Sequence, residues 1–182
     1  NQNYLTPENR VPGSLLPYPW ESCIISGGGW SFTPGAKYMS GREGVHLLVD
    51  IVAKGGNLLL NVAPGPDGTW QQGAYDLLAG MGAWLKVNGE AIYGTRPWTI
   101  AAEGSAKSTS GAFTDNEESQ YTAEDIRFTT KGDFLYAISL DWSEDEIMVR
   151  SINRSREVEQ VTMLGSEETL AWTQTDEGLR VR

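Results

Sequence analysis

Apolar residues recur at helical spacing in two stretches of the first half of the chain. The first stretch begins after Ser40 and ends before Gly55, and its apolar positions are Val45, Leu48, Val49, Ile51 and Val52. Ser40 and Glu43 have the spacing of a capping box, and a glycine commonly follows the last helical residue. The second stretch is expected to be capped by Thr69 and to end near Asn88. Its apolar positions are Ala74, Leu77, Leu78, Met81, Trp84 and Leu85. Both patterns predict amphipathic helices.

Shorter apolar runs alternate with these helices and predict strands. Residues 24–25 form a short run before a glycine triplet, and residues 58–62 are apolar except for Asn61. A nearly continuous apolar run is typical of a strand that is covered on both faces of a parallel sheet. The alternation of strand and helix therefore predicts an α/β layer or barrel.

The second half has another pattern, in which short alternating runs are separated by turn residues. Residues 126–128 and 134–138 flank Lys131-Gly132-Asp133 and predict a β-hairpin, whereas residues 102–124 are polar and predict a linker or long loop. Further strands are predicted at residues 147–149, 158–163, 170–172 and 179–181, at the spacing of a β-sandwich. We place the boundary near Trp98, with an α/β domain over residues 1–98 and an all-β domain over residues 99–182.

The predicted strands do not make a complete architecture. The first half offers too few strands for a closed barrel or a doubly wound sheet, and the last predicted strand runs to the end of the chain. An unpaired strand favours association with other chains. We therefore expect a piece of a larger protein, or a chain that closes against another chain.

Composition excludes several classes of partner and cofactor. The net charge of −10 argues against nucleic acid or an anionic membrane as partner, since both require clustered Lys and Arg. With one cysteine and one histidine, the chain has no internal disulfide and little basis for a transition-metal site. We expect no metal and no cofactor. The seven Trp and seven Tyr suit either contact with carbohydrate or a core rich in aromatic residues.

Several longer motifs occur in a fixed order along the chain. They are PWESC at residues 19–23, a tryptophan in a glycine-rich stretch at Trp30, LLVDIVAKGGNLLLNVAPGPDGT at 47–69 and WLKVNGEAIYGTRPW at 84–98. Together they resemble the α-L-fucosidases of glycoside hydrolase family twenty-nine, densely over residues 17–98 and more loosely beyond. The resemblance implies the C-terminal part of a (β/α)8-like TIM barrel followed by an antiparallel β-sandwich.

The resemblance also implies an activity. Enzymes of this family are retaining hydrolases of terminal α-L-fucose, with a nucleophile and an acid/base carboxyl group about 5–5.5 Å apart. The family's nucleophile is an Asp on an upstream barrel segment, and no Asp precedes Asp50 here. We therefore expect the nucleophile in the remaining N-terminal part of the barrel, a fucosylated oligosaccharide or glycoconjugate as substrate, and a periplasmic or secreted location. A non-catalytic carbohydrate-binding or structural module derived from a fucosidase is the alternative.

Glu21 is our first candidate for the acid/base, and Glu8 is the alternative. Glu21 adjoins Trp20 and begins a short apolar segment, and a catalytic acid gains from partial burial against an aromatic ring. A structural hydrogen bond or ion pair at the barrel rim is the other role open to Glu21. Glu8 lies in a proline-containing loop, and a solvated surface carboxylate is the other role open to it. Trp30 and Trp20 are the candidates for contact with the sugar, with Trp30 either an apolar wall for the fucose methyl group or a packing residue.

Overall fold

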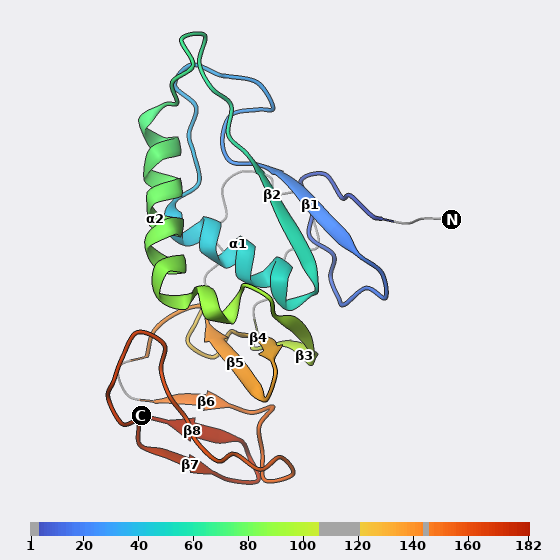
Figure 1. Cartoon of the computed structure of the whole chain (residues 1–182), viewed down its shortest axis with the longest axis vertical. Helices are drawn as coiled ribbons and strands as arrows, with labels where there is room; N and C mark the ends of the chain where they lie inside the picture. Colours follow the sequence, from blue (N-terminus) through green and yellow to red (C-terminus); the bar gives the residue numbers. More distant parts are fainter. Residues whose placement is uncertain (1–3, 106–120, 144–145) are drawn as a thin grey trace.

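The computed structural model describes residues 4–105, 121–143 and 146–182. A mixed α/β half is followed by an all-β half, and the two halves lie end to end (Figure 1). In the described ranges no helix has the length and apolar character needed to cross a membrane.

Two parallel strands form the centre of the first half. Strand β1 (Trp20–Ile25) pairs with β2 (Gly56–Asn61) in a register that sets Glu21 opposite Asn57 and Cys23 opposite Leu59. The segment before β1 runs along its other edge, where Leu5 and Glu8 make parallel bridges to Trp20 and Cys23. Three parallel segments therefore lie side by side, and their carboxyl ends meet at one edge.

Helix α1 (Gly41–Ala53) forms as the sequence predicts. The Ser40 hydroxyl accepts from the Glu43 amide at 3.2 Å, and the Ser40 amide donates to Glu43 Oε2 at 2.6 Å, which completes the capping box. Gly55, at φ 79°, follows the C-terminal cap residue Lys54. Such a left-handed turn suits glycine, because it has no Cβ to clash. The chain then enters β2 directly.

Helix α2 (Gln72–Asn88) ends where the sequence predicts, but its predicted cap is wrong. Gln71 occupies the N-cap position, and its side chain makes no capping bond. Thr69 instead donates through its amide and hydroxyl to Asp67 Oδ1, at 3.0 and 2.8 Å. The Asp67 carboxylate therefore holds Thr69 in a turn three residues before the helix begins. A short 3₁₀ turn, η1 (Gly89–Ala91), closes α2.

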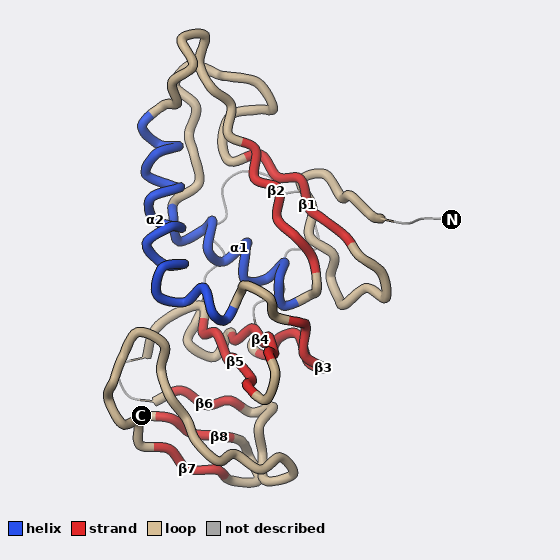
Figure 2. The backbone as a smooth tube through the Cα atoms, viewed as in Figure 1, coloured by secondary structure: helices blue, strands red, loops and turns tan. Residues whose placement is uncertain are grey.

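Helices α1 and α2 cover only one face of the β1–β2 sheet (Figure 2). Leu58 and Leu60 pack into the clusters that both helices supply, whereas Leu59 is 50 % exposed. Because successive side chains of a strand point to opposite faces, the described residues cover one face of β2 and leave the other open, and the expected cover on both faces stays a prediction. The uncovered face carries Glu21, Cys23, Ile25, Asn57, Leu59 and Asn61.

The all-β half contains two three-stranded antiparallel sheets. Strands β3 (Arg96–Glu103), β4 (Ile126–Lys131) and β5 (Phe134–Ser139) form one sheet, and the predicted hairpin between β4 and β5 is confirmed. Strand β3 is not predicted by the sequence pattern, and Trp98 lies inside it.

The second sheet has the order β6-β8-β7. It contains β6 (Ile147–Val149), β7 (Trp172–Gln174) and β8 (Leu179–Val181), so the predictions for β6 and β8 are confirmed and β7 begins two residues later than expected. The strand predicted at residues 158–163 is wrong. Val158 and Val161 pack against the apolar cluster of this half without pairing their backbone in a sheet.

A buried ionic cluster joins the two halves. Asp50 on α1 accepts from Lys54 Nζ and from Arg127 Nε of β4, each at 2.7 Å. All three residues are at most 5 % exposed. Burial lowers the pKa of Lys54, while Asp50 opposes that change. Removing the two cations from water costs free energy. The shared Asp50 carboxylate offsets this cost because both of its ion pairs are short.

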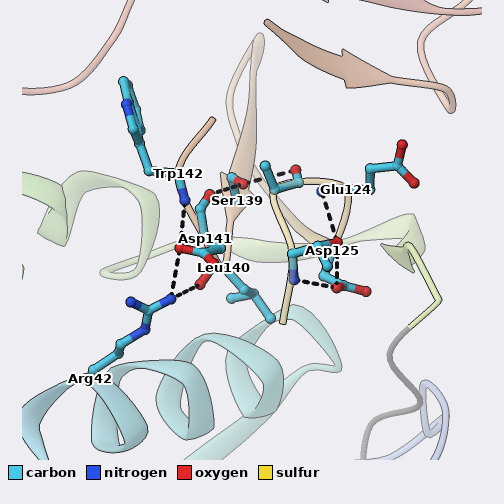
Figure 3. Close-up of polar contacts among 9 residues, drawn as sticks. Arg42, Glu124, Asp125, Ser139, Leu140, Asp141 and Trp142 are labelled. Carbon is cyan, nitrogen blue, oxygen red and sulfur yellow. Dashed lines mark hydrogen bonds and ion pairs between the residues drawn. The ribbon is translucent and has the colours of Figure 1, made fainter. Parts of the chain in front are cut away.

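A second contact between the halves lies at the surface, near the start of α1 (Figure 3). Arg42 donates to the Asp141 carboxylate at 2.8 Å and to the Leu140 carbonyl at 3.5 Å. Close by, the Ser139 hydroxyl donates to the Asp141 carbonyl at 2.6 Å. Helix α1 therefore contacts the all-β half both inside and at its rim.

Candidate functional site

Glu8 and Trp30 come together at the carboxyl edge of the parallel segments. Trp30 Nε1 donates to Glu8 Oε1 at 3.0 Å, and both side chains are exposed. Glu8 is registered with Cys23, which lies on the uncovered face of the sheet. Since paired residues point to the same face, the Glu8 carboxylate belongs to that face.

The backbone around Glu8 is fixed by neighbouring groups. The Asn9 amide donates to the Cys23 carbonyl at 2.8 Å, and the Cys23 amide donates to the Pro7 carbonyl at 3.1 Å. The Asn9 side chain also accepts from the Ile25 amide at 3.0 Å. The exposed carboxylate of Glu8 is thus carried on a backbone that is paired on both sides of it.

Glu21 lies on the same face but further from this edge. It is the second residue of β1, is half-buried, and its amide donates to the Leu5 carbonyl at 2.9 Å. Glu8 is registered with Cys23, two residues beyond Glu21, so the two glutamates are offset along the strands by about 7 Å. The structure therefore brings Glu8, and not Glu21, to Trp30.

Trp20 lies on the opposite, covered face. Its side chain is 1 % exposed, and Nε1 donates to the Lys54 carbonyl at 3.2 Å. The ring lies against Gly56, where an added Cβ would come within 2.4 Å of a ring carbon. A sugar contact requires an exposed ring face, and in this structure the Trp20 ring packs in the core instead.

Asn61 adds an unexplained polar group at the same edge. It is the last residue of β2, and its Oδ1 is buried without a hydrogen-bond partner among the described residues. Buried polar atoms in native structures usually have a partner, so an unsatisfied one needs an explanation. Asn61 lies on the face that carries Glu8, which makes it a candidate polar group of the site.

Two loops extend from this edge and are tied to each other. One follows β1 and contains Trp30, and the other follows β2 and leads to Gln71. The Gln71 side chain accepts from the Gly35 amide at 2.7 Å and donates to the Thr33 carbonyl at 2.9 Å. The loops therefore form one connected rim at the carboxyl edge.

The described residues offer little to bind a metal. Across these ranges no three His, Cys, Asp or Glu side chains are grouped as metal ligands would be. His46 packs edge-on against the Tyr121 ring, with centroids 4.8 Å apart, and burial and the nearby Arg42 lower its pKa. Its contacts are those of a packing residue.

Two family models match the chain. One, described as Alpha-L-fucosidase, matches residues 1–90, and the other, described as Alpha-L-fucosidase C-terminal domain, matches residues 118–182. An α-L-fucosidase of Branchiostoma floridae is 36% identical over 174 residues, which are 93% of this chain and 35% of the relative. The tissue α-L-fucosidase of Homo sapiens is 32% identical over 173 residues, with 92% and 34% covered. The chain thus spans about a third of the length of these relatives.

Solved structures show the same similarity. The α-fucosidase of Thermotoga maritima in complex with fucose matches with a TM-score of 0.78 and 28% identity, and the match covers 100% of this chain and 38% of that one. The α-L-fucosidase isoenzyme 1 of Paenibacillus thiaminolyticus matches with a TM-score of 0.78 and 26% identity, over 98% and 40%. Both halves are therefore arranged much as in these proteins.

Proposed function

This chain belongs to the α-L-fucosidase family, and on that premise we propose that it is part of a retaining exo-α-L-fucosidase that removes terminal α-L-fucose from glycans. The observation that carries the proposal is the pairing of Glu8 with Trp30 at the carboxyl edge of three parallel segments. Active sites of barrel enzymes lie at that edge, because the loops that follow the strands gather there.

The open face of the β1–β2 sheet supports the barrel interpretation. Helices α1 and α2 cover one face, while Leu59 is 50 % exposed on the other. In a barrel the helices lie outside and alternate residues of each strand fill the interior. We propose that the remaining part of the barrel covers this face and supplies the aspartate nucleophile, that the two later sheets form the β-sandwich, and that the domains divide near Trp98.

Geometry favours Glu8 over Glu21 as the acid/base. Glu8 lies at the carboxyl edge beside an exposed tryptophan, whereas Glu21 lies near the start of β1. In the first step the Glu8 carboxyl group would protonate the departing glycosidic oxygen while the nucleophile bonds to the anomeric carbon. In the second, the Glu8 carboxylate would accept a proton from the water that releases fucose. The Trp30 ring, 40 % exposed, would form the apolar wall for the fucose methyl group.

Glutamine substitutions in the complete enzyme test this assignment. Glu8→Gln should slow hydrolysis of a fucosylated oligosaccharide by about 10²–10⁴-fold, since proton transfer to the leaving group is lost. An aryl fucoside with an activated leaving group should be affected far less, and azide should restore turnover of the Glu8→Gln enzyme.

Glu21→Gln is the matched control, and it should leave the ratio between the two substrates unchanged. If the ratio changes in Glu21→Gln and stays constant in Glu8→Gln, the acid/base is Glu21.

A carbohydrate-binding module without turnover is the second candidate function. It is favoured by the exposed ring of Trp30, which suits contact with a sugar whether or not turnover follows. A complete protein that binds fucose and hydrolyses no fucoside would establish this alternative.

A further inference from the structure

An open hollow lies between the two loops that extend from the carboxyl edge. Its volume is about 260 Å³, and it is lined by Phe32 of the first loop and by residues 65–67 and 69–71 of the second loop. The two loops run next to each other at the end of the molecule away from the all-β half (Figure 1). Sites for drug-sized ligands measure about 300–1,000 Å³, so this hollow suits a smaller group.

The hollow is held open by specific contacts. Gln71 ties the first loop to the second through Gly35 and Thr33, as described above. The Gly65 amide donates to the Thr69 carbonyl at 2.7 Å and closes the second loop on itself. At Gly65, an added Cβ would lie 3.3 Å from a Phe32 ring carbon, so the missing side chain leaves that ring uncovered.

The groups around the hollow have the chemistry that recognises a sugar ring. Trp70 is 38 % exposed, and the ring of Tyr75 lies against it with centroids 5.5 Å apart. The Asp67 carboxylate is an acceptor for sugar hydroxyls. Both bonds from Thr69 end on Oδ1, so neither uses Oδ2, and these bonds hold the pKa of Asp67 below its usual value. Aromatic faces beside one ionised acceptor suit a pyranose, which has apolar C–H faces and polar edges.

The hollow also lies close to the residues of the proposed fucose site. Phe32 follows Trp30 by two residues, so their Cα atoms are at most about 7 Å apart. Trp30 contacts Glu8 directly. A sugar unit attached to a fucose at Glu8 and Trp30 is therefore within reach of Phe32 and Trp70.

We propose that this hollow binds the pyranose to which the fucose is attached, with Trp70 and Phe32 against its faces and Asp67 at its hydroxyls. The proposal rests on the proposed fucosidase function and adds a specificity site to it. The sequence pattern does not single out Phe32 or Trp70. The available signal is that each is an aromatic residue in a loop that directly follows a predicted strand.

Two substrates that differ only in the leaving group test the proposal in the complete enzyme. Fucosyllactose carries a pyranose next to fucose, whereas α-L-fucosyl fluoride carries a single atom. Trp70→Ala should reduce kcat/KM for fucosyllactose by about 2- to 12-fold, the range that corresponds to a single aromatic contact. The value for fucosyl fluoride should stay within about twofold, and Trp70→Phe should recover part of the loss on fucosyllactose.

Trp142→Ala is the matched control, because Trp142 is 67 % exposed in the all-β half. Trp142→Ala should change kcat/KM for neither substrate. An equal loss on both substrates in Trp70→Ala, or no loss on either, would overturn the proposal while leaving fucosidase activity in place.

A binding measurement covers the case in which the complete protein hydrolyses neither substrate and the proposed function fails. Lactose titrated into the wild-type protein should bind, with weaker binding to Trp70→Ala. Equal affinities, or no binding to either protein, would also overturn the proposal.

Discussion

The junction between α1 and β4 and the loop edge around Glu8 are built in opposite ways. At the junction, Asp50, Lys54 and Arg127 are buried and share close ion pairs. At the loop edge, Glu8 and Trp30 are exposed and joined by one side-chain hydrogen bond. Separating buried, paired charges costs free energy, because each charge is then left unpaired away from water. Exposed groups can instead bond to water or to a ligand. The first region is therefore suited to fixing the fold and the second to exchanging partners.

The strongest test of this contrast is Asp50→Ala. It removes the carboxylate from two buried cations and should lower the free energy of unfolding by about 3–5 kcal/mol. Urea unfolding of the complete protein, followed by circular dichroism, measures the loss. Asp76→Ala is the control, since Asp76 is exposed on α2 and bonds to Gln72 at its surface. Equal stability of the Asp50 and Asp76 variants would show that the buried cluster does not stabilise the junction.

A smaller effect is expected at the loop edge from Gln71→Ala. Three hydrogen bonds to the first loop are lost, those to Gly35, Thr33 and the Tyr38 hydroxyl, each worth about 0.5–1.5 kcal/mol. The change should be local, with faster hydrogen exchange at the Gly35 amide and unchanged exchange in α1. Gln72→Ala should leave Gly35 unaffected, because the Gln72 side chain bonds to Asp76. Faster exchange throughout α1 in Gln71→Ala would contradict the separation of the two regions.

The smallest effect is expected at the exposed contact between Arg42 and Asp141. The Trp142 amide and the Arg42 guanidinium lower the pKa of Asp141. A lowered folded-state pKa contributes stability above the unfolded pKa, about 3.9 for Asp, and the contribution disappears as pH falls through the folded-state value. Asp141→Asn should therefore melt slightly below the wild type at pH 7, and the two melting temperatures should converge once the pH falls below the folded-state pKa of Asp141. A difference in melting temperature that stays the same at pH 7 and at acidic pH would rule out the charge of Asp141 as its cause.

Local signals explain why helix α1 and the β4–β5 hairpin are predictable. The capping box at Ser40 and Glu43 and the glycine after Lys54 fix both ends of α1 through bonds made within a few residues. The β4–β5 hairpin is specified in the same way by Gly132 and its alternating flanks. Elements whose boundaries depend on near neighbours can be inferred without knowledge of the rest of the fold.

Contacts between residues distant in sequence account for most of the differences between the predicted and the observed elements. Strand β3 exists because residues 96–103 pair with β4 across more than twenty positions, which no local pattern signals. Thr69 is a residue type that often caps helices, but its amide and hydroxyl donate to the Asp67 carboxylate instead. Residues 158–163 have the apolar pattern of a strand. Their side chains pack against the apolar cluster, but their backbone pairs with no strand.

The site follows the same division. Trp30 and Glu8 both have the right residue type for a sugar site, but only the parallel register reveals that they meet. Trp20 and Glu21 adjoin in sequence and point to opposite faces of the sheet, so nearness in sequence is misleading for them. The role of Glu21 or Glu8 as acid/base stays a prediction until the glutamine variants are measured.

The ion pair between Asp50 and Arg127 can form only after both residues have been synthesised, so α1 is made before its partner on β4. The two residues are 77 positions apart, so α1 leaves the ribosome well before its charge partner on β4 has been made. At about 5–20 residues per second, Asp50 waits several seconds for Arg127. Closure of the junction is therefore a late step, and substitutions in β4 should reduce the yield of folded chains in the cell more than substitutions in the loops around Glu8.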